Sequence, residues 1–145
     1  MDDKFQEHTK YLNIESDNDK ILGNVRLIYD NKFIGIQISQ NDEDGMTAEI
    51  QLNITKFQRV VKALEKACDL ILNGAFHHER ETVDIIYTTG SSEKRKGFVL
   101  VSIFEDSIIL VVSLTNGGDP YLMISKKQIS ELITLFQTVK APQYD

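Results

Sequence analysis

The sequence predicts an α+β fold made of two ββββα repeats, each an antiparallel four-stranded sheet followed by a helix. Three observations lead to this prediction. Apolar and polar residues alternate in several short segments, which is typical of half-buried strands. Two longer segments repeat their apolar residues every three or four positions, which is typical of an amphipathic helix. The same order of strands, turns and helix then occurs twice along the chain.

The first repeat is expected to begin with four strands. Turn-forming residues separate them, including the acidic stretches at residues 15–19 and 42–45 and the Asp30-Asn31-Lys32 turn. The strands are therefore placed around residues 11–14, 21–29, 33–40 and 46–52. In the third strand, alternation puts Phe33 on the face opposite to the one formed by Ile34, Ile36 and Ile38.

A helix is expected over residues 53–73, where the spacing of the apolar residues changes. Asn53 has a side chain suited to an N-cap, and Asn73-Gly74 provides a C-terminal stop. The apolar stripe between them consists of Phe57, Val60, Val61, Leu64, Cys68 and Ile71. Because Cys68 lies on this stripe, we interpret it as a small core residue rather than as a nucleophile.

The second repeat follows the same order. Its strands are expected at residues 83–88, 98–104, 108–114 and 121–124. The connections are a basic turn at Lys94-Arg95-Lys96-Gly97, a tight turn at Glu105-Asp106 and a turn at residues 116–119. Ser125 then caps a second helix, which ends at Lys140-Ala141-Pro142 and whose stripe contains Ile129, Leu132, Ile133 and Phe136.

The two repeats can be aligned with each other. Residues 28–34 match residues 103–109 at an offset of 75, and the helix at Asn53 matches the helix at Ser125 at an offset of 72. We interpret this as an internal duplication; the alternative is that any two antiparallel meanders ending in a helix look alike. A single domain over residues 1–145 is expected, with the first repeat at about 10–73, a linker at about 74–81 and the second repeat at about 82–140.

The strands of the second repeat are apolar on both faces. In the strand at residues 108–114, Ile108, Leu110 and Val112 are apolar, and so are Ile109 and Val111 between them. A strand that is apolar on both sides needs cover on both sides. The sheet of the first repeat or a second subunit is expected to provide it.

The composition excludes several classes of protein. With 16 Lys and Arg against 22 Asp and Glu, the formal net charge of -6 argues against a protein that coats duplex DNA by charge alone. The charge is uneven, however, since residues 54–100 hold 8 bases and 6 acids, which leaves room for a local binding surface. The acidic clusters in the first 53 residues are interpreted as solvated turns, because they lack the ligand spacing of a calcium loop.

Other sequence features argue against an enzyme, a metal site and a membrane protein. The single cysteine excludes an internal disulfide and fits a cytoplasmic location. No secretory signal is visible, and the longest apolar run, Ile108 to Val112, is too short to span a bilayer. No phosphate-binding loop or nucleophile elbow is present, so neither catalysis nor a cofactor is expected. His77-His78-Glu79 is interpreted as linker rather than as a metal site.

Two segments of the first repeat resemble a known family. Residues 23–38, and Ala48-Glu49-Ile50-Gln51-Leu52-Asn53 followed by an amphipathic helix, are similar to the positive cofactor four family of transcription coactivators. Two ββββα units in one chain resemble the related Whirly fold. The resemblance covers roughly residues 10–140 as a pattern. It implies single-stranded nucleic-acid binding on curved β surfaces, and assembly as dimers or as tetramers of duplicated chains.

The expected function is therefore single-stranded nucleic-acid binding, with DNA preferred over RNA, in replication, recombination or transcription. Such binding needs aromatic rings for the bases and cations for the phosphates. The candidate residues are Arg26, Tyr29, Lys32, Phe33, Tyr87, Lys94, Arg95 and Lys96, with Phe98 and Phe104 as further platforms. Core packing of the rings and a solvated loop at the basic turn are the alternatives.

An alternative function is an acidic homo-oligomeric module that regulates or scaffolds another protein without binding nucleic acid. In either case the expected assembly is a homodimer or a higher homo-oligomer.

Overall fold

The computed structural model describes residues 7–30, 32–41, 45–74, 77–88, 96–115 and 117–139. Its elements along these ranges are β1 (His8–Glu15), β2 (Ile21–Tyr29), β3 (Ile34–Gln40), β4 (Thr47–Leu52), α1 (Ile54–Leu72), β5 (His77–Tyr87), β6 (Gly97–Glu105), β7 (Ser107–Leu114), β8 (Tyr121–Ile124) and α2 (Lys126–Gln137). Sheet A has the strand order β1-β2-β3-β4 and sheet B the order β5-β6-β7-β8. All neighbouring strands are antiparallel. The predicted α+β fold of two ββββα repeats is therefore confirmed.

The helix boundaries agree closely with the sequence pattern. Helix α1 covers nearly all of the expected range, and the side chain of Asn53 accepts a hydrogen bond from the backbone nitrogen of Lys56 at 2.9 Å. Ser125 also occupies the N-cap position of α2, but its side chain makes no capping hydrogen bond. Its capping role is thus positional only, and α2 relies on packing of its apolar stripe.

The strand registers correct the alignment of the two repeats. Tyr29 pairs with Ile34 in sheet A, and Ile103 pairs with Ile108 in sheet B, so equivalent residues of these hairpins are 74 apart rather than 75. The difference of one residue matters because successive strand residues point to opposite faces. An offset of 75 would align Tyr29 with Phe104, which lies on the opposite face of its sheet.

Strand β5 begins earlier than the sequence pattern indicated. Residues 77–81 were expected to lie in a linker, but they belong to β5, and His77 pairs with Glu105 of β6. The side chains of residues 79–82 are all exposed. This part of the strand therefore has no buried face, which is why no apolar alternation marks it in the sequence.

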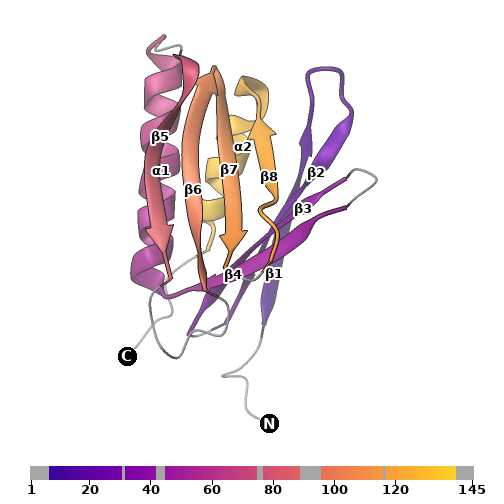
Figure 1. Ribbon diagram of the computed structural model, residues 1–145, viewed down its shortest axis with the longest axis vertical. Helices are drawn as coiled ribbons and strands as arrows, with labels where there is room; N and C mark the ends of the chain where they lie inside the picture. The colour runs from indigo at the N-terminus through magenta and orange to yellow at the C-terminus, as the bar shows by residue number, and fades with distance from the viewer. Residues whose placement is uncertain are drawn as a thin grey trace.

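Each helix packs against the sheet of the other repeat. Helix α1, which follows sheet A, contacts β5, β6 and β7, while α2, which follows sheet B, contacts β1 as well as β7. The two sheets also touch directly where β3 and β4 meet β7 and β8. Figure 1 shows α1 behind β5 and β6, and the strands of sheet A running obliquely to those of sheet B. Of the two covers that the sequence left open for sheet B, the sheet of the first repeat is therefore present, together with the helices.

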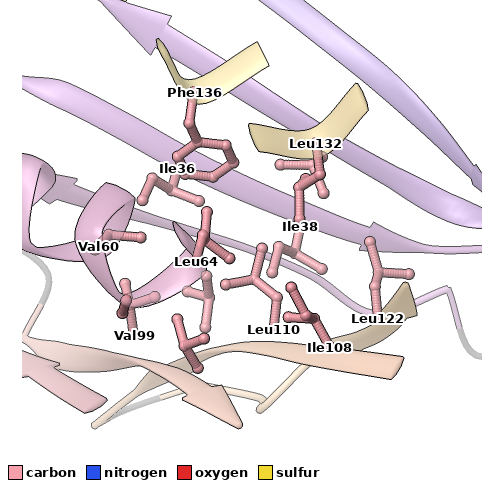
Figure 2. Packing of buried hydrophobic residues seen from close by; sticks show 14 of the residues in the cluster. Ile36, Ile38, Val60, Leu64, Val99, Ile108, Leu110, Leu122, Leu132 and Phe136 are labelled. Carbon is pink, nitrogen blue, oxygen red and sulfur yellow. The ribbon is translucent and has the colours of Figure 1, made fainter. Parts of the chain in front are cut away.

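A single core lies between these layers. Figure 2 shows Ile36 of sheet A and Leu110 of sheet B facing Leu64 of α1 and Phe136 of α2. All four side chains are fully buried. The rings of Phe57 and Phe136, one from each helix, stack with their centroids 5.6 Å apart. Because residues of both repeats share this core, neither repeat has a core of its own.

Polar contacts also tie each helix to the first strand of the other repeat. Arg59 of α1 donates from Nε and Nη2 to the two carboxylate oxygens of Asp84 in β5, at 2.8 and 2.7 Å. Gln128 of α2 accepts a hydrogen bond from the nitrogen of Glu15 at 2.6 Å and donates to the carbonyl oxygen of Asn13 at 2.9 Å. At this point of the β1 edge, the amide of Gln128 makes the hydrogen bonds that a neighbouring strand would otherwise make.

The Arg59–Asp84 pair makes the stability of the fold depend on pH. Hydrogen bonds from Arg59 hold the pKa of the Asp84 carboxyl below its usual value. A carboxylate with a lowered pKa stabilises the fold at pH values above its unfolded pKa, and this contribution disappears as the pH falls through the folded pKa. The pair therefore stabilises the protein at neutral pH and not in strong acid.

We expect Asp84→Asn to lower the free energy of unfolding by about 0.5–1 kcal/mol at pH 7 and by less at about pH 2, because the carboxyl of Asp84 becomes protonated as the pH falls through its lowered pKa. The effect is small because the Arg59 side chain is 55% exposed, so water screens the pair. Urea denaturation at both pH values measures it. Glu131→Gln, at an exposed position on α2, is the control. If the difference in the free energy of unfolding between Asp84→Asn and the wild type did not change with pH, the Arg59–Asp84 pair would not be the cause of the pH dependence.

Candidate nucleic-acid interface

The outer face of sheet A, which points away from the core, is open to solvent and mostly polar. We call it outer face A. The strand registers place its side chains in three rows across the sheet, and the central row runs Tyr11, Arg26, Gln37 and Glu49. The flanking rows consist of Asn13, Asn24, Ser39 and Thr47 on one side and of Thr9, Ile28, Gly35 and Gln51 on the other. The face therefore offers many hydrogen-bonding groups to a ligand.

Tyr11 and Arg26 form the end of the central row. The guanidinium carbon of Arg26 lies 6.0 Å from the centroid of the Tyr11 ring, at the outer limit of a cation–π contact. The Tyr11 side chain is 62% exposed, and Arg26 is exposed as well. An exposed ring beside a cation is suited to stack on a base while the cation contacts the neighbouring phosphate.

Outer face A lacks a side chain at one position on β3, which is Gly35. A Cβ there would lie 3.1 Å from Oε2 of Glu49 and 3.3 Å from the carbonyl oxygen of Ile28. In the central row, Nε2 of Gln37 donates to Oε1 of Glu49 at 3.4 Å. Glu49 places a carboxylate at the β4 side of the face, which opposes phosphate binding there. A strand bound next to Tyr11 and Arg26, at the β1 side, avoids this charge.

The β2–β3 turn presents two of the predicted residues at one end of sheet A. Asp30 fixes this turn, because its Oδ1 accepts hydrogen bonds from the backbone nitrogens of Lys32 at 2.8 Å and of Phe33 at 2.9 Å. Lys32 and Phe33 are both exposed. Phe33 lies immediately before β3, and continuing the alternation from the buried Ile34 predicts that it lies on the side of outer face A. A cation and an aromatic ring are thus adjacent in the sequence at this end of the sheet.

Tyr29 lies on the other side of the sheet. Its strand partner Ile34 is buried, and its ring packs against the core and stacks on His8 with the centroids 5.2 Å apart. It therefore does not share a face with Arg26. Tyr29 therefore fits the alternative interpretation that the sequence left open, in which the ring packs against the core.

The second repeat holds the remaining predicted residues that the structure describes. Tyr87 is exposed at the end of β5, and its ring lies 5.5 Å from that of Phe98 in a tilted arrangement. Lys96 is exposed immediately before β6. Both belong to sheet B, so the predicted residues divide between the two sheets instead of forming one site. Lys94 and Arg95 lie outside the described residues.

Tyr11 was not among the predicted residues, although it is the most exposed aromatic ring on outer face A. The signal was present in the sequence. Tyr11 alternates with Thr9 and Asn13 on one side of its strand, while Leu12 and Ile14 alternate on the other. An aromatic residue among polar ones in a period-two pattern belongs on the polar face, where it is free to bind a ligand.

The described residues carry no sign of a metal centre or a reactive thiol. No group of three or more His, Cys, Asp or Glu side chains converges among them. Cys68 is partly buried on α1, and burial, followed by the charge of Asp69, raises the pKa of its thiol. Over the same part of the chain, neither helix is long and apolar enough to cross a membrane.

Comparisons with known proteins leave the family open. No protein-family model matches the chain, and no curated protein is significantly similar to it. The resemblance to the positive cofactor four and Whirly families therefore stays a prediction. The arrangement of sheets and helices stands on its own, and any function is argued from the residues described above.

Proposed function

We propose that the chain binds single-stranded nucleic acid, preferably DNA, on outer face A. The observation that carries this proposal is the Arg26 guanidinium beside the exposed Tyr11 ring on an open four-stranded sheet. Base stacking on aromatic rings together with cations along the backbone is the usual chemistry of single-strand binding. The polar side chains in the flanking rows supply hydrogen bonds to base edges.

The charge of the protein limits how tightly such a face can bind. The chain has a net charge of -6, and Glu49 shares outer face A with Arg26. Few cations are therefore available to displace counterions from the strand, and stacking has to supply much of the affinity. We expect weak binding that decreases as salt is added and that depends more on Tyr11 than on any single cation.

The test is a titration of fluorescently labelled oligo-dT at about 50 mM salt, followed by anisotropy. Tyr11→Ala is expected to weaken binding by roughly 5- to 100-fold, because one base loses its stacking platform. Arg26→Ala is expected to weaken it by roughly tenfold. Lys62→Ala is the matched control, since it removes the same charge from an exposed position on α1 and should change the affinity little.

Three results would contradict the proposal. The first is no binding of oligo-dT at about 50 mM salt, where electrostatic attraction is still strong. The second is binding of duplex DNA as tightly as of the single strand, because a paired base cannot stack on Tyr11. The third is an equal loss of affinity in Lys62→Ala and Arg26→Ala. RNA of the same length, titrated in parallel, tests the preference for DNA.

A role in replication, recombination or transcription is part of this proposal and rests on the resemblance to the positive cofactor four and Whirly families. The alternative function, an interaction module without nucleic-acid binding, is favoured by the apolar outer surface of sheet B. Co-purification of a basic protein, together with a negative oligonucleotide titration, would support that alternative.

A further inference from the structure

The free edge of β1 is an open side of sheet A. Strand β1 comes first in the order of this sheet, and among the described residues no strand pairs with its second side. In an antiparallel ladder, the N–H and C=O groups of every second residue point to the same neighbour. Gln128 of α2 bonds to the carbonyl oxygen of Asn13 and to the nitrogen of Glu15, so the odd-numbered residues of β1 direct these groups away from β2.

Gln128 satisfies only one end of this edge. Thr9 and Tyr11 share the orientation of Asn13 in the regular part of the strand. Within the part of the chain that the structure describes, their outward N–H and C=O groups have no hydrogen-bond partner. Such groups at a strand edge are a template for another strand. Two pairing positions are therefore free, directly beyond the point where Gln128 takes the place of a strand.

A groove of about 610 Å³ lies along this free part of the edge, between β1 and α2. Leu12 of β1 and Leu135 of α2, both half-buried, form its apolar part. Lys10 and Glu131 also line it, and neither forms a salt bridge with another described residue. Glu131 borders the neighbouring hollow around Gln128 as well, so it lies toward that end of the edge and Lys10 toward the other. The groove thus has an apolar middle and two unpaired charges of opposite sign.

We propose that this edge and groove bind an extended peptide segment of another protein, which adds to sheet A as a fifth strand antiparallel to β1. Residues of the segment opposite Tyr11 and Thr9 exchange two backbone hydrogen bonds with each of them. The side chain opposite Leu12 is apolar and lies in the groove, and the one opposite Lys10 is acidic. A basic side chain at the start of the segment reaches Glu131.

The chemistry of the edge selects a peptide over a nucleic-acid strand. A phosphodiester backbone offers hydrogen-bond acceptors only, so it leaves the outward carbonyl oxygens of Thr9 and Tyr11 unsatisfied, whereas a peptide supplies donors and acceptors in alternation. The segment uses the backbone of Tyr11 and the inner side of β1, while the Tyr11 ring stays on outer face A. This site is therefore independent of the strand-binding face proposed above, and each can fail without the other.

Amide hydrogen exchange followed by NMR tests the edge in the full chain. Without a ligand, we expect the amides of Lys10 and Leu12, which point to β2, to exchange slowly and those of Thr9 and Tyr11 to exchange fast. A bound segment is expected to slow the exchange of Thr9 and Tyr11. Slow exchange of these two amides in the free protein would show that the edge is already covered, and it would overturn the proposal.

The probe is the hexapeptide Lys-Thr-Leu-Thr-Glu-Thr with both termini blocked, titrated by NMR. Antiparallel pairing places its Leu opposite Leu12, its Glu opposite Lys10, and its last two Thr residues opposite Tyr11 and Thr9. We expect a dissociation constant on the order of 100 μM. Methylation of the backbone nitrogens of these two Thr residues is expected to weaken binding about tenfold or more, because it removes the donors. Glu-Thr-Leu-Thr-Lys-Thr, in which the charges are exchanged, is expected to bind roughly 3- to 10-fold more weakly.

Two variants test the site from the side of the protein. Thr9→Pro removes an outward N–H without breaking the ladder to β2, and it is expected to weaken binding by about 3- to 10-fold. Thr9→Val, which keeps the N–H, is its control. Thr134→Arg places a large side chain in the groove from an exposed position on α2 and is expected to weaken binding about tenfold or more. Thr55→Arg, the same change at an exposed position on α1, is its control.

Three further results would overturn the proposal. The first is no change at Thr9 and Tyr11 with about 2 mM of the hexapeptide, well above the expected dissociation constant. The second is equally tight binding of the N-methylated peptide, since strand addition requires those donors. The third is an equal loss of affinity in Thr134→Arg and Thr55→Arg while circular dichroism shows both to be folded. Binding that the N-methyl groups, Thr9→Pro and Thr134→Arg each weaken, and that both control variants retain, supports it.

Discussion

Replacing Phe136 with Ala is expected to lower the free energy of unfolding by about 3–5 kcal/mol. The Phe136 side chain is fully buried and lies at the point where both helices and both sheets meet. Its removal leaves a cavity that the surrounding strands cannot close, because their backbones are fixed by the ladders of two sheets. The stacking on Phe57 from the other helix is lost as well.

Urea denaturation followed by circular dichroism measures this loss. Leu72→Ala is the control, since Leu72 is apolar but exposed at the end of α1, and we expect a change within about 0.5 kcal/mol. A double-mutant cycle of Phe57→Ala and Phe136→Ala isolates the contact between the repeats, with an expected coupling of about 0.5–1.5 kcal/mol. A loss below about 1 kcal/mol for Phe136→Ala would show that the core does not join the repeats in this way.

Gly23→Ala is expected to destabilise the protein by about 2–3 kcal/mol. A Cβ at this position would overlap the backbone carbonyl oxygen of Ser39 and would lie 2.9 Å from Cδ2 of Leu122. Ser39 belongs to the neighbouring strand and Leu122 to the opposite sheet. The Ser39 carbonyl oxygen is backbone and cannot give way without moving β3, whereas the Leu122 side chain can turn aside.

Gly35→Ala is the matched control for this prediction. It lies in the same sheet, but its Cβ would point to outer face A, where it meets the flexible end of Glu49 at 3.1 Å and the carbonyl oxygen of Ile28 no closer than 3.3 Å. We expect a change of less than about 1 kcal/mol, since the carboxylate can turn away and Ala suits a strand better than Gly does. Thermal or urea unfolding of the two variants gives the comparison. An equal loss of stability in Gly23→Ala and Gly35→Ala would contradict the close contact between Gly23 and Ser39.

The sequence predicts the elements well because each is marked by a local pattern. The stripe from Phe57 to Ile71 and the cap at Asn53 define α1 almost to the residue. The alternation around Ile34, Ile36 and Ile38 gives the correct buried face of β3. These features depend on neighbours in the sequence, and a period of 3.6 or 2 is enough to identify them.

The errors arise where the sequence pattern does not indicate which side of a strand faces the core. In β7 the residues from Ile108 to Val112 are apolar at every position, so alternation cannot say which face is inward, and the alignment of the repeats was shifted by one. By contrast, alternation does distinguish Tyr29, which follows Val25 and Leu27 on the apolar side of β2, from Tyr11, which lies on the polar side of β1. Each helix packs on the sheet of the other repeat through contacts between residues far apart in the sequence. No local sequence pattern predicts this arrangement, which we call the exchange of helices.

The exchange of helices also has a consequence for synthesis of the chain on the ribosome. Strand β1 is synthesised long before the helix that covers it, α2 (Lys126–Gln137), because seven strands and α1 lie between them in the sequence. Gln128 likewise donates to Asn13 and accepts from Glu15, so these hydrogen bonds join residues more than 110 positions apart. The nascent first repeat is thus left with exposed apolar surface and an open strand edge until α2 has emerged.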